Sequence, residues 1–515
     1  MSSLLVSDRR IGAAALVAAL GRWRRPGPAY AALADAVRRA VLAGALPLST
    51  RVPGERELAA ALGVSRTTTT GAYGLLRDEG YLVSRQGSGT VTALPGTAPA
   101  PLSPAPADRE RSTRRTRERV LPALPVHHPL AADGVVDLTI AACPAPTALA
   151  EATAGAVVDL PRYAAGHGYA PLGLDVLREA VADRYTARGT PTTPDQVLVT
   201  SGAQHAIALL MATHAGPGDR VVVEQPTYPH AMDAARAVGA RPVPVPTGAA
   251  GLDVDLLEST VRQVAPRVVY LIPDHHNPTG ATLDAAARER VRVLARRTGT
   301  LVAGDEVLTD LTLDGPEPEP FAGDGTGTRV VSIGSMSKSH WGGLRVGWLR
   351  GPADLVTRLA LARRSGDLGT AVLDQLVAAA LLRTGASPLD ERRARLRTGR
   401  DTLVALLGER LPTWRFTVPA GGQSLWVDLG ASVSSALSAL ALAHGVRVAP
   451  GPTFGVDGGM EDRLRLPFTA EPADLARAVD GLALAWAALG APGLPAPGRQ
   501  PDPLGVAAPP VAALV

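Results

Sequence analysis

The sequence predicts a multidomain α/β protein, in which a small, mainly helical front domain precedes a large domain with a mainly parallel central sheet. At 515 residues the chain exceeds the size of one ordinary domain. Residues 28–95 combine helical hydrophobic spacing with two short strand patterns, whereas residues 133–490 alternate strand and helix patterns, as parallel sheets do. A proline-rich stretch between the two predicts a linker.

Composition is typical of a globular protein from a reducing compartment. Hydrophobic residues make up 46%, which is enough for a sizeable core, but aromatic residues only 3%, so that core must consist of Leu, Val and Ala. The single cysteine, Cys143, excludes an internal disulfide and favours a cytoplasmic location. No run approaches 18 uninterrupted apolar residues, so we expect no membrane span, and no metal site is expected either.

Positive charge is concentrated in the front of the chain. Residues 1–95 carry twelve arginines and six acidic residues, although the whole chain has a net charge of only +4. A polyanionic partner would therefore bind the front. Residues 1–27 are predicted to be an N-terminal extension with a short helix, because their charges flank a helical pattern and no convincing export cleavage site follows.

Residues 28–95 show the pattern of a helix-turn-helix followed by a wing. In "GERELAAALGVSRTTTTGAYGLLRDEGYL", Gly63 suits the left-handed turn between two helices, and Ser65 suits the N-cap of the second. "YLVSRQGSGTVT" predicts two short strands around a glycine-rich turn, which would form the wing. This spacing brings the start of the second helix to the base edges of double-stranded DNA. A small helical cap on an enzyme is the alternative.

Two segments lack the composition of a packed core. Residues 96–132 are rich in proline and arginine and predict a linker, whose cluster from Arg109 to Arg119 either contacts DNA phosphates or is simply solvated. Residues 491–515 have low complexity and predict a disordered tail.

Three strand patterns of the large domain end in residues suited to chemistry. "RVVYLIPDHHNPTG" leads to Asn277, "TLVAGDE" to Asp305, and "RVVSIGSMSK" to Lys338. Ligands collect beyond the carboxyl ends of strands in open α/β sheets, so these residues are expected to meet in one site. In "QVLVTSGAQHAI" a strand, a turn and a helix start follow one another, and backbone N–H groups there can cradle a phosphate. The residues of this cradle are Gly202, Ala203 and Gln204.

Lys338 is the only lysine in a chain that uses arginine for every other basic side chain. Arginine stays protonated, whereas lysine can lose its proton and form a Schiff base with an aldehyde. The aldehyde cofactor that combines such a lysine with a carboxylate and a phosphate cradle is pyridoxal 5′-phosphate (PLP), which we expect on Lys338. Asp305 would then hold the pyridine nitrogen protonated, Asn277 would bind the phenolic oxygen, and Tyr228 would stack on the ring. The residues expected to neutralise the phosphate are Ser335, Ser337 and Arg345.

The front segment "STRVPGERELAAALGVSRTTT…GLLRDEGYLVSRQGSGT" resembles the winged helix-turn-helix of GntR-type bacterial regulators nearly throughout. The resemblance implies that arginines contact DNA and that Gly87 lies at the wing tip. The expected DNA-binding residues are Arg51, Arg56, Ser65, Arg66, Thr67, Thr69 and Gly87.

Residues 160–470 resemble the fold type I aminotransferases through "GYAPLGLDVLREAVADRYTARG", "TSGAQHA", "NPTG", "SMSK" and "RLRLPF". The resemblance implies a PLP-dependent transferase fold type I domain. Arg465 matches the arginine that clamps a substrate α-carboxylate, and Tyr169 matches a tyrosine that reaches the phosphate in the partner subunit, which implies a head-to-tail homodimer. In one departure, Val307 and Leu308 stand where the family has a tyrosine that binds the phenolic oxygen, so efficient transamination is in doubt.

A GntR-type reader in front of an aminotransferase-like body is similar to the layout of MocR-type regulators over residues 28–485, and "SMSKSHWGGLRVGW" looks closest to an actinobacterial branch labelled YczR-like. The resemblance implies a PLP-dependent transcriptional regulator that binds operator DNA and whose body senses PLP or a small amine or amino acid effector. The alternative is a genuine aminotransferase with an accessory DNA-binding domain. A scaffold without cofactor is a third alternative, against which the intact Lys338, Asp305 and Asn277 argue.

Overall fold

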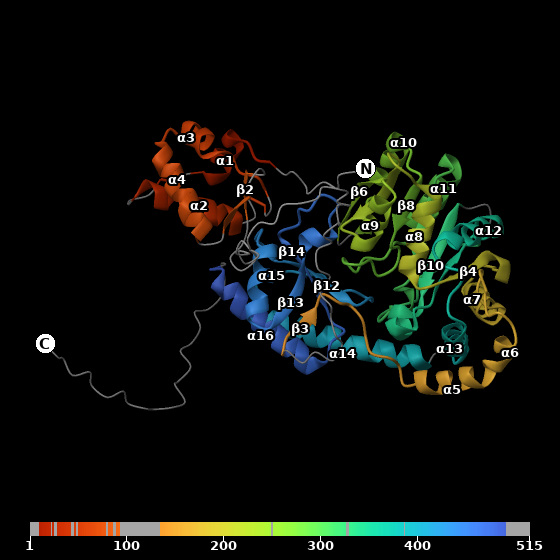
Figure 1. Ribbon diagram of the computed structural model, residues 1–515. Coiled ribbons are helices and arrows are strands. Elements are labelled where there is room, and N and C mark those ends of the chain that lie inside the picture. Colours follow the sequence, from red (N-terminus) through yellow and green to blue (C-terminus); the bar gives the residue numbers. More distant parts are fainter. Residues whose placement is uncertain are drawn as a thin grey trace, which may run out of the picture.

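The computed structural model describes residues 10–21, 23–24, 28–42, 46–47, 50–78, 81–85, 89–92, 134–248, 251–325, 329–385 and 387–490. Figure 1 shows the front domain in red to red-orange, and the large domain in colours from orange through yellow and green to blue. The linker and the tail expected at residues 96–132 and 491–515 lie outside the described residues, as does the wing-tip glycine, Gly87.

The front domain has the helix order of a winged helix-turn-helix. Gly63 adopts the left-handed conformation (φ 62°) that the sharp turn requires, and the backbone N–H of Thr68 donates to Ser65 Oγ at 3.2 Å, so Ser65 caps the second helix as predicted. Its elements are α1 (Ala13–Leu20), α2 (Ala29–Leu42), α3 (Glu55–Leu62), α4 (Arg66–Asp78) and the antiparallel wing strands β1 (Leu82–Arg85) and β2 (Gly89–Thr92). Leu16 and Leu20 of α1 lie in the same core cluster as Leu33 and Leu76, so the N-terminal helix packs against the domain.

The large domain is built on an eight-stranded sheet. In order across the sheet, the strands are β4 (Val197–Thr200), β11 (Gly347–Arg350), β10 (Val330–Ser335), β9 (Leu301–Asp305), β8 (Val268–Leu271), β5 (Arg220–Gln225), β6 (Arg241–Gly248) and β7 (Gly251–Leu252). The five strands from β10 to β6 pair in parallel, whereas β11 and β7 run antiparallel to their neighbours. The predicted mainly parallel sheet is therefore confirmed, and β8, β9 and β10 are adjacent.

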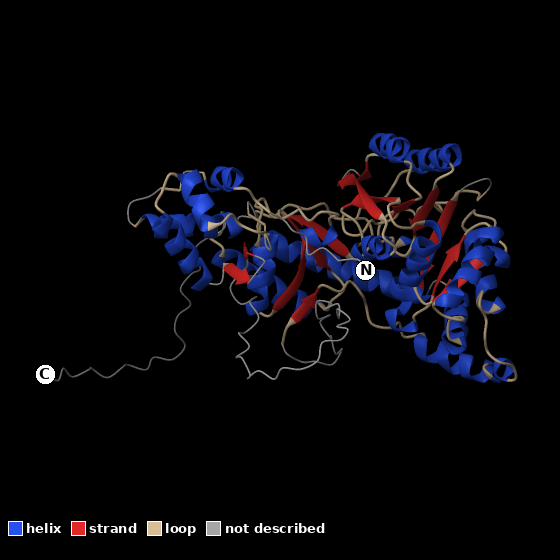
Figure 2. Ribbon diagram, turned by 45° about the horizontal axis from the view of Figure 1, so that its top comes forward, coloured by secondary structure: helices blue, strands red, loops and turns tan. Residues whose placement is uncertain are grey.

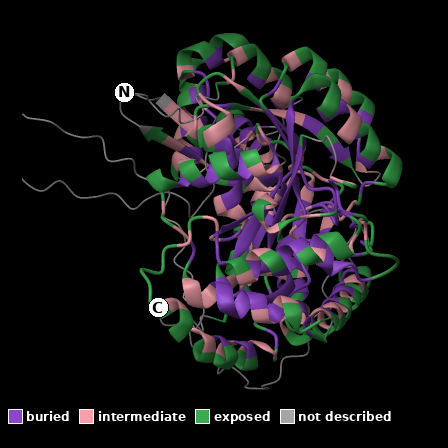
Figure 3. Cartoon of the chain, turned by 90° about the vertical axis from the view of Figure 1, so that its right-hand side faces the viewer, coloured by how far each residue is buried: buried purple, intermediate pink, exposed green. Residues whose placement is uncertain are grey.

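Helices cover both faces of this sheet, because its central strands are apolar on both sides. Figure 2 shows the red strands between blue helices, and Figure 3 shows the buried purple centre under helices with green outer faces. The helices of this part are α5 (Leu149–Asp159), α6 (Pro161–Ala164), α7 (Asp175–Ala187), α8 (Ala203–His214), α9 (Pro229–Ala237), α10 (Val254–Val264), α11 (Ala285–Thr298), α12 (Ala353–Ala362) and α13 (Val372–Arg383). Its short helical turns are η1 (Pro194–Gln196), η2 (Thr309–Leu311), η3 (Ser337–Trp341), η4 (Gly342–Leu344) and η5 (Arg363–Ser365).

A second, four-stranded sheet carries the other side of the site. Its order is β12 (Ser424–Asp428), β14 (Arg463–Pro467), β13 (Val446–Pro450) and β3 (Val136–Leu138), in which the edge strand β3 runs parallel to β13. Strands of this sheet pack with α14 (Ser387–Arg410), α15 (Ser434–Ala443) and α16 (Pro472–Ala488) around one core, and η6 (Gly451–Phe454) follows β13. Within the described residues, no helix is both long enough and apolar enough to span a bilayer.

Candidate functional site

The three strand ends singled out in the sequence do meet. Asp305 is the last residue of β9, Lys338 lies three residues beyond β10 in the π-helix η3, and Asn277 follows β8. Because these strands are adjacent and parallel, their carboxyl ends share one edge of the sheet. A π-turn inside a chain often marks a functional position, and here it holds the lysine.

The pKa of the Lys338 amine lies well below that of a free lysine. Its Nζ donates to the backbone carbonyl oxygen of Ala141 at 2.5 Å. Burial and then the positive charge of Arg465 lower the pKa of Lys338 to about 8, against the pull of the Asp305 carboxylate. A lower pKa raises the fraction of free amine at neutral pH, and the free amine is the form that attacks an aldehyde.

Asp305 is a buried carboxylate with one protein donor on each oxygen. Val307 N–H donates to Oδ1 at 3.1 Å, and the Tyr270 hydroxyl donates to Oδ2 at 2.6 Å. Burial raises the pKa of Asp305 to about 6, and the bond from Tyr270 opposes that rise. Tyr270 was missed by the sequence interpretation, because one tyrosine within the apolar run "RVVYLI" is typical of a core strand.

Arg465 lies on β14 with its guanidinium facing the same site. Nη1 donates to Asn277 Oδ1 at 3.3 Å, Nη2 donates to the carbonyl oxygen of Thr139 at 2.5 Å, and the guanidinium lies 4.9 Å from the ring centre of Phe454. Its side chain forms no ion pair with a described carboxylate, Nε has no hydrogen-bond partner there, and burial lowers the pKa of Arg465 to about 10. A buried guanidinium of this kind suits an incoming carboxylate.

The bond from Arg465 also fixes how Asn277 is turned. Because Asn277 Oδ1 accepts from the arginine, its amide nitrogen is left to donate to a ligand. Tyr228, at the N-cap of α9, is half-buried beside these groups, and burial followed by the charge of Asp305 raises its pKa to about 12. The neutral tyrosine ring therefore remains a stacking surface at any ordinary pH.

A cradle of the expected kind lies at the start of α8. Gly202 has φ 88°, and a Cβ there would come within 2.9 Å of Arg345 Nη2. A Cβ on Gly347 would come within 2.8 Å of the backbone nitrogen of Ala203, so only glycine lets the strand and the helix start approach this closely. Arg345 Nη2 donates to the carbonyl oxygen of Ser201 at 3.0 Å, which holds the arginine over the turn. The side-chain amide of Gln204 is turned away from this turn and donates to the carbonyl oxygen of His230, so only the backbone N–H of Gln204 is left for the cradle.

Ser335 is hydrogen-bonded within its own chain: its hydroxyl donates to the carbonyl oxygen of Val346 at 3.1 Å and accepts from the backbone N–H of Ser337 at 3.1 Å. Its expected contact with the phosphate stays a prediction. Ser337 is half-buried, and Arg345 is exposed. Tyr169 has 62% of its surface exposed, and its expected contact with a partner subunit stays a prediction.

The structure has no tyrosine at Val307 or Leu308, where the family has one that binds the phenolic oxygen of the cofactor. Val307 is half-buried next to Asp305, and Leu308 packs into the core of the smaller sheet. Neither side chain has a hydrogen-bond donor, so Asn277 is left to serve the phenolic oxygen of the cofactor. No three described His, Cys, Asp or Glu side chains gather as a metal site would require.

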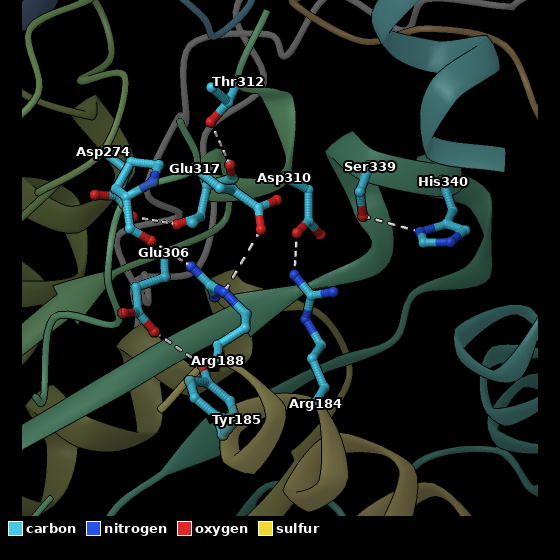
Figure 4. Close-up of polar contacts among 12 residues, drawn as sticks. Arg184, Tyr185, Arg188, Asp274, Glu306, Asp310, Thr312, Glu317, Ser339 and His340 are labelled. Carbon is cyan, nitrogen blue, oxygen red and sulfur yellow. Dashed lines mark hydrogen bonds and ion pairs between the residues drawn. The ribbon is translucent and has the colours of Figure 1, made fainter. Parts of the chain in front are cut away.

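A polar network lies behind the site and braces its strand ends. In Figure 4, Arg184 of α7 points to Asp310 of η2, and the Tyr185 hydroxyl donates to Glu306 Oε2 at 2.9 Å. Ser339 Oγ and His340 Nδ1 lie 2.9 Å apart just beyond Lys338, and burial lowers the pKa of His340 to about 4. These bonds fix the segments that carry Asp305 and Lys338 from the side away from the ligand.

The DNA-binding candidates of the front domain fall into two groups. Arg56, Ser65, Arg66 and Thr67 are exposed around the turn and the start of α4, and half-buried Arg51 pairs with the wing strand through Val91. The second group is Thr69, which is buried, so the prediction that it contacts DNA is wrong.

The Thr69 side chain is fully buried, and its hydroxyl donates to the carbonyl oxygens of Glu55 and Arg66 at 2.9 Å each. Thr69 lies on the inner face of α4 together with Ala72, Tyr73 and Leu76, where its hydroxyl ties α4 to the start of α3 instead of facing DNA.

The residues of the site fit PLP on their own chemistry. Lys338 supplies the amine for the aldehyde, Asp305 the carboxylate for the pyridine nitrogen, Asn277 a donor for the phenolic oxygen, and the turn at Gly202 with Arg345 the phosphate cradle. When bound, PLP supplies an electron sink for an amine-bearing ligand. The protein positions that ligand by its carboxylate on Arg465, and Lys338 can hold or release a proton beside it.

Comparisons with known proteins agree with both halves. A model of class I and II aminotransferases matches residues 136–482, and a model of the GntR family of bacterial regulatory proteins matches residues 29–91. The chain is 33% identical to a 2-aminoadipate transaminase of Thermus thermophilus, over 60% of this chain and 76% of that protein. It is 28% identical to the HTH-type transcriptional regulator YisV of Bacillus subtilis, over 86% of this chain and 92% of that protein.

A solved structure shares the fold of the large domain. It is LysN, an α-aminoadipate aminotransferase of Thermus thermophilus in complex with N-(5′-phosphopyridoxyl)-L-leucine, with a TM-score of 0.63 and 29% identity over 69% of this chain and 93% of that one. The fold belongs to PLP-dependent proteins, and the relatives that also cover the front domain are named as regulators. The chain thus belongs to the class I and II aminotransferase family and, with its GntR-type domain in front, is a MocR-type, PLP-dependent transcriptional regulator.

Proposed function

We propose that this regulator senses a small amino acid or amine at the PLP site and that the bound ligand changes its affinity for operator DNA. One observation carries the proposal. A chain with a DNA-reading helix also retains a half-buried Lys338 and buried Asp305 and Arg465 around one site, which a pure DNA-binding scaffold has no need to keep. A ligand acts only through unequal affinity for the two states of the protein.

The site favours an effector that carries a carboxylate. The Arg465 guanidinium is buried and pairs with no described carboxylate, so an incoming carboxylate gains a charge-assisted bond without first breaking an ion pair. The effector amine would take the place of Lys338 at the cofactor aldehyde, since both groups are amines. PLP itself is the simplest alternative effector, because its binding fills the same site.

A short segment offers a route from this site to the front domain. The carbonyl oxygens of Thr139 and Ala141 accept from Arg465 and Lys338, the two groups that the effector would engage. This segment follows β3, the edge strand of the smaller sheet. The described part of the large domain begins at residue 134, two residues before β3 and directly after the expected linker. We infer that an effector carboxylate competes with Thr139 for Arg465, and that the resulting shift of residues 139–141 is passed along β3 to the linker.

The unit that binds DNA is proposed to be a head-to-tail homodimer. Tyr169 is 62% exposed, so its side chain is accessible to a second chain. The resemblance to aminotransferases gives that hydroxyl a role at the phosphate of the partner subunit. Two front domains in one dimer would also read two operator half-sites.

The second candidate is an aminotransferase whose front domain only locates it on DNA. Its support is the group formed by Lys338, Asp305 and Asn277 and the likeness to enzymes named as transaminases. Against efficient turnover stands the pair Val307 and Leu308, which provides no hydroxyl for the phenolic oxygen. We propose at most weak transaminase activity, in the cytoplasm where the regulated DNA is found.

The deciding experiment uses the full-length protein and the DNA upstream of its own gene. We expect visible absorbance from bound PLP, and an operator affinity that changes when PLP or an amino acid is added. Lys338→Ala should abolish that response. Unchanged DNA affinity in every condition, with keto acid formed at useful rates, would support the enzyme instead.

A further inference from the structure

Tyr270 lies in the middle of β8, and its hydroxyl meets the carboxylate that serves the pyridine nitrogen. The side chain is fully buried, and its O–H donates to Asp305 Oδ2 at 2.6 Å. Tyr270 is paired in register with Ala303 of β9, and Asp305 is two positions further along that strand. Residues two apart on a strand share a face, so the phenol and the carboxylate point the same way by construction of the sheet.

The two donors on Asp305 divide its oxygens. Val307 N–H occupies Oδ1 at 3.1 Å, the Tyr270 hydroxyl occupies Oδ2, and the remaining lone pairs are left for a ligand. The backbone donor can fix only one oxygen, so without the phenol the carboxylate could rotate about its last bond. A carboxylate that rotates no longer presents a lone pair to one fixed direction.

We propose that Tyr270 is a positioning residue for the cofactor, whose hydroxyl holds the Asp305 carboxylate in the one orientation that faces the pyridine nitrogen of PLP. The proposal rests on PLP as the cofactor and is independent of whether the ligand controls DNA binding. The protein would then support the two ends of the cofactor ring in different ways. A phenol supports the nitrogen end, whereas Val307 and Leu308 supply no phenol at the oxygen end.

Electrostatics agree with this geometry. Burial raises the pKa of Asp305, whereas the bond from Tyr270 lowers it and so favours the carboxylate over the neutral acid. Burial and the Asp305 charge in turn raise the pKa of Tyr270 well above its usual value, so the phenol stays a donor. A less firmly held carboxylate would protonate the pyridine nitrogen less completely, and the ring would then withdraw fewer electrons.

The chain offers a matched control for the test. Tyr185 is also buried, and its hydroxyl also donates to a buried carboxylate, Glu306, which is the residue after Asp305. Glu306 faces the network behind the site (Figure 4), where its other oxygen accepts from the backbone N–H of Phe321. Tyr270→Phe and Tyr185→Phe therefore both remove a phenol that donates to a buried carboxylate, but only the first touches Asp305. Tyr185→Phe also removes the acceptor of the Trp348 indole N–H, which adds to its expected loss of stability.

The experiment compares full-length wild type with Tyr270→Phe and Tyr185→Phe, with PLP as the titrant. For Tyr270→Phe we expect roughly tenfold weaker PLP binding and an upward shift of the pH at which the absorbance of bound PLP changes. For Tyr185→Phe we expect lower thermal stability with PLP affinity and absorbance profile as in wild type. In an Asp305→Asn background, Tyr270→Phe should add no further loss of PLP affinity.

Two outcomes would overturn the proposal. In one, Tyr270→Phe and Tyr185→Phe lose similar stability and both keep the wild-type PLP affinity and pH profile, which makes Tyr270 a core residue only. The other concerns folding. If Tyr270→Phe does not fold, the double variant with Asp305→Asn should fold, because the unsupported charge is then gone. Failure of both to fold would assign Tyr270 to packing.

Discussion

The guanidinium of Arg465 and the backbone carbonyl oxygen of Thr139 are 2.5 Å apart, so the arginine of β14 is bonded to the chain just beyond β3. The same guanidinium bonds Asn277 from the large sheet. Arg465 thus joins the two sheets at the ligand site. A carboxylate that accepts from both Nη groups competes with Thr139 for Nη2, whereas Nε has no hydrogen-bond partner among the described residues.

Arg465→Lys is expected to weaken binding of an amino acid effector roughly thirtyfold, about 2 kcal/mol, while PLP still binds. A lysine keeps the positive charge but offers no planar pair of donors for a carboxylate. The measurement is the change in PLP absorbance as amino acids are titrated in. Arg463→Lys on the same strand, whose side chain pairs with Asp428, serves as the control and should leave effector affinity unchanged. Equal loss in both variants would contradict the clamp.

The rate of PLP capture by the cofactor-free protein is expected to rise with pH through a midpoint near pH 8 and to level off at higher pH. The pKa of Lys338 is lowered to about 8 by burial and the charge of Arg465, and only the amine deprotonated above that pKa attacks the aldehyde. Removing the Arg465 charge raises the pKa of Lys338, so Arg465→Met should move the midpoint to higher pH. Stopped-flow absorbance gives the rates. A midpoint near 10.5, as for a free lysine, would contradict the prediction.

Arg184→Met is expected to lower the free energy of unfolding by about 3 kcal/mol, because Asp310 would be left largely buried without its partner. The pair Arg358 and Asp354 is exposed on α12, so Arg358→Met should cost less than about 0.5 kcal/mol. Denaturant unfolding of the cofactor-free protein measures both. Asp310→Asn added to Arg184→Met should recover part of the loss, since the unpaired charge is then removed.

The residues at the strand ends of the site could be predicted from the sequence. Each is marked by its local sequence, and the carboxyl ends of parallel strands lie at the same edge of a sheet. Asn277, Asp305 and Lys338 each end an apolar run, and parallel strands bring their ends together wherever they lie in the sheet. The turn of the front domain was predictable for the same reason, since Gly63 and Ser65 act on their own neighbours.

The error at Thr69 and the omission of Tyr270 concern hydroxyl groups whose partners are distant in sequence. Thr69 is bonded to Glu55 fourteen residues earlier, so its side chain resembled a free donor in the sequence. Tyr270 was missed because its partner, Asp305, is 35 residues away on the next strand. A tertiary bond of this kind leaves no periodic signal in the sequence.

The correction at Thr69 leads to a prediction for DNA binding. Arg66→Ala should weaken operator binding at every sequence and reduce the slope of log affinity against log salt by about one, because an exposed guanidinium at the start of α4 neutralises one phosphate. Thr69→Val should instead lower the stability of the front domain by about 1 kcal/mol, through loss of the bond to Glu55, and leave the salt slope unchanged. Salt-dependent fluorescence anisotropy together with thermal unfolding separates the two effects. A reduced salt slope in Thr69→Val at unchanged stability would return Thr69 to the DNA surface.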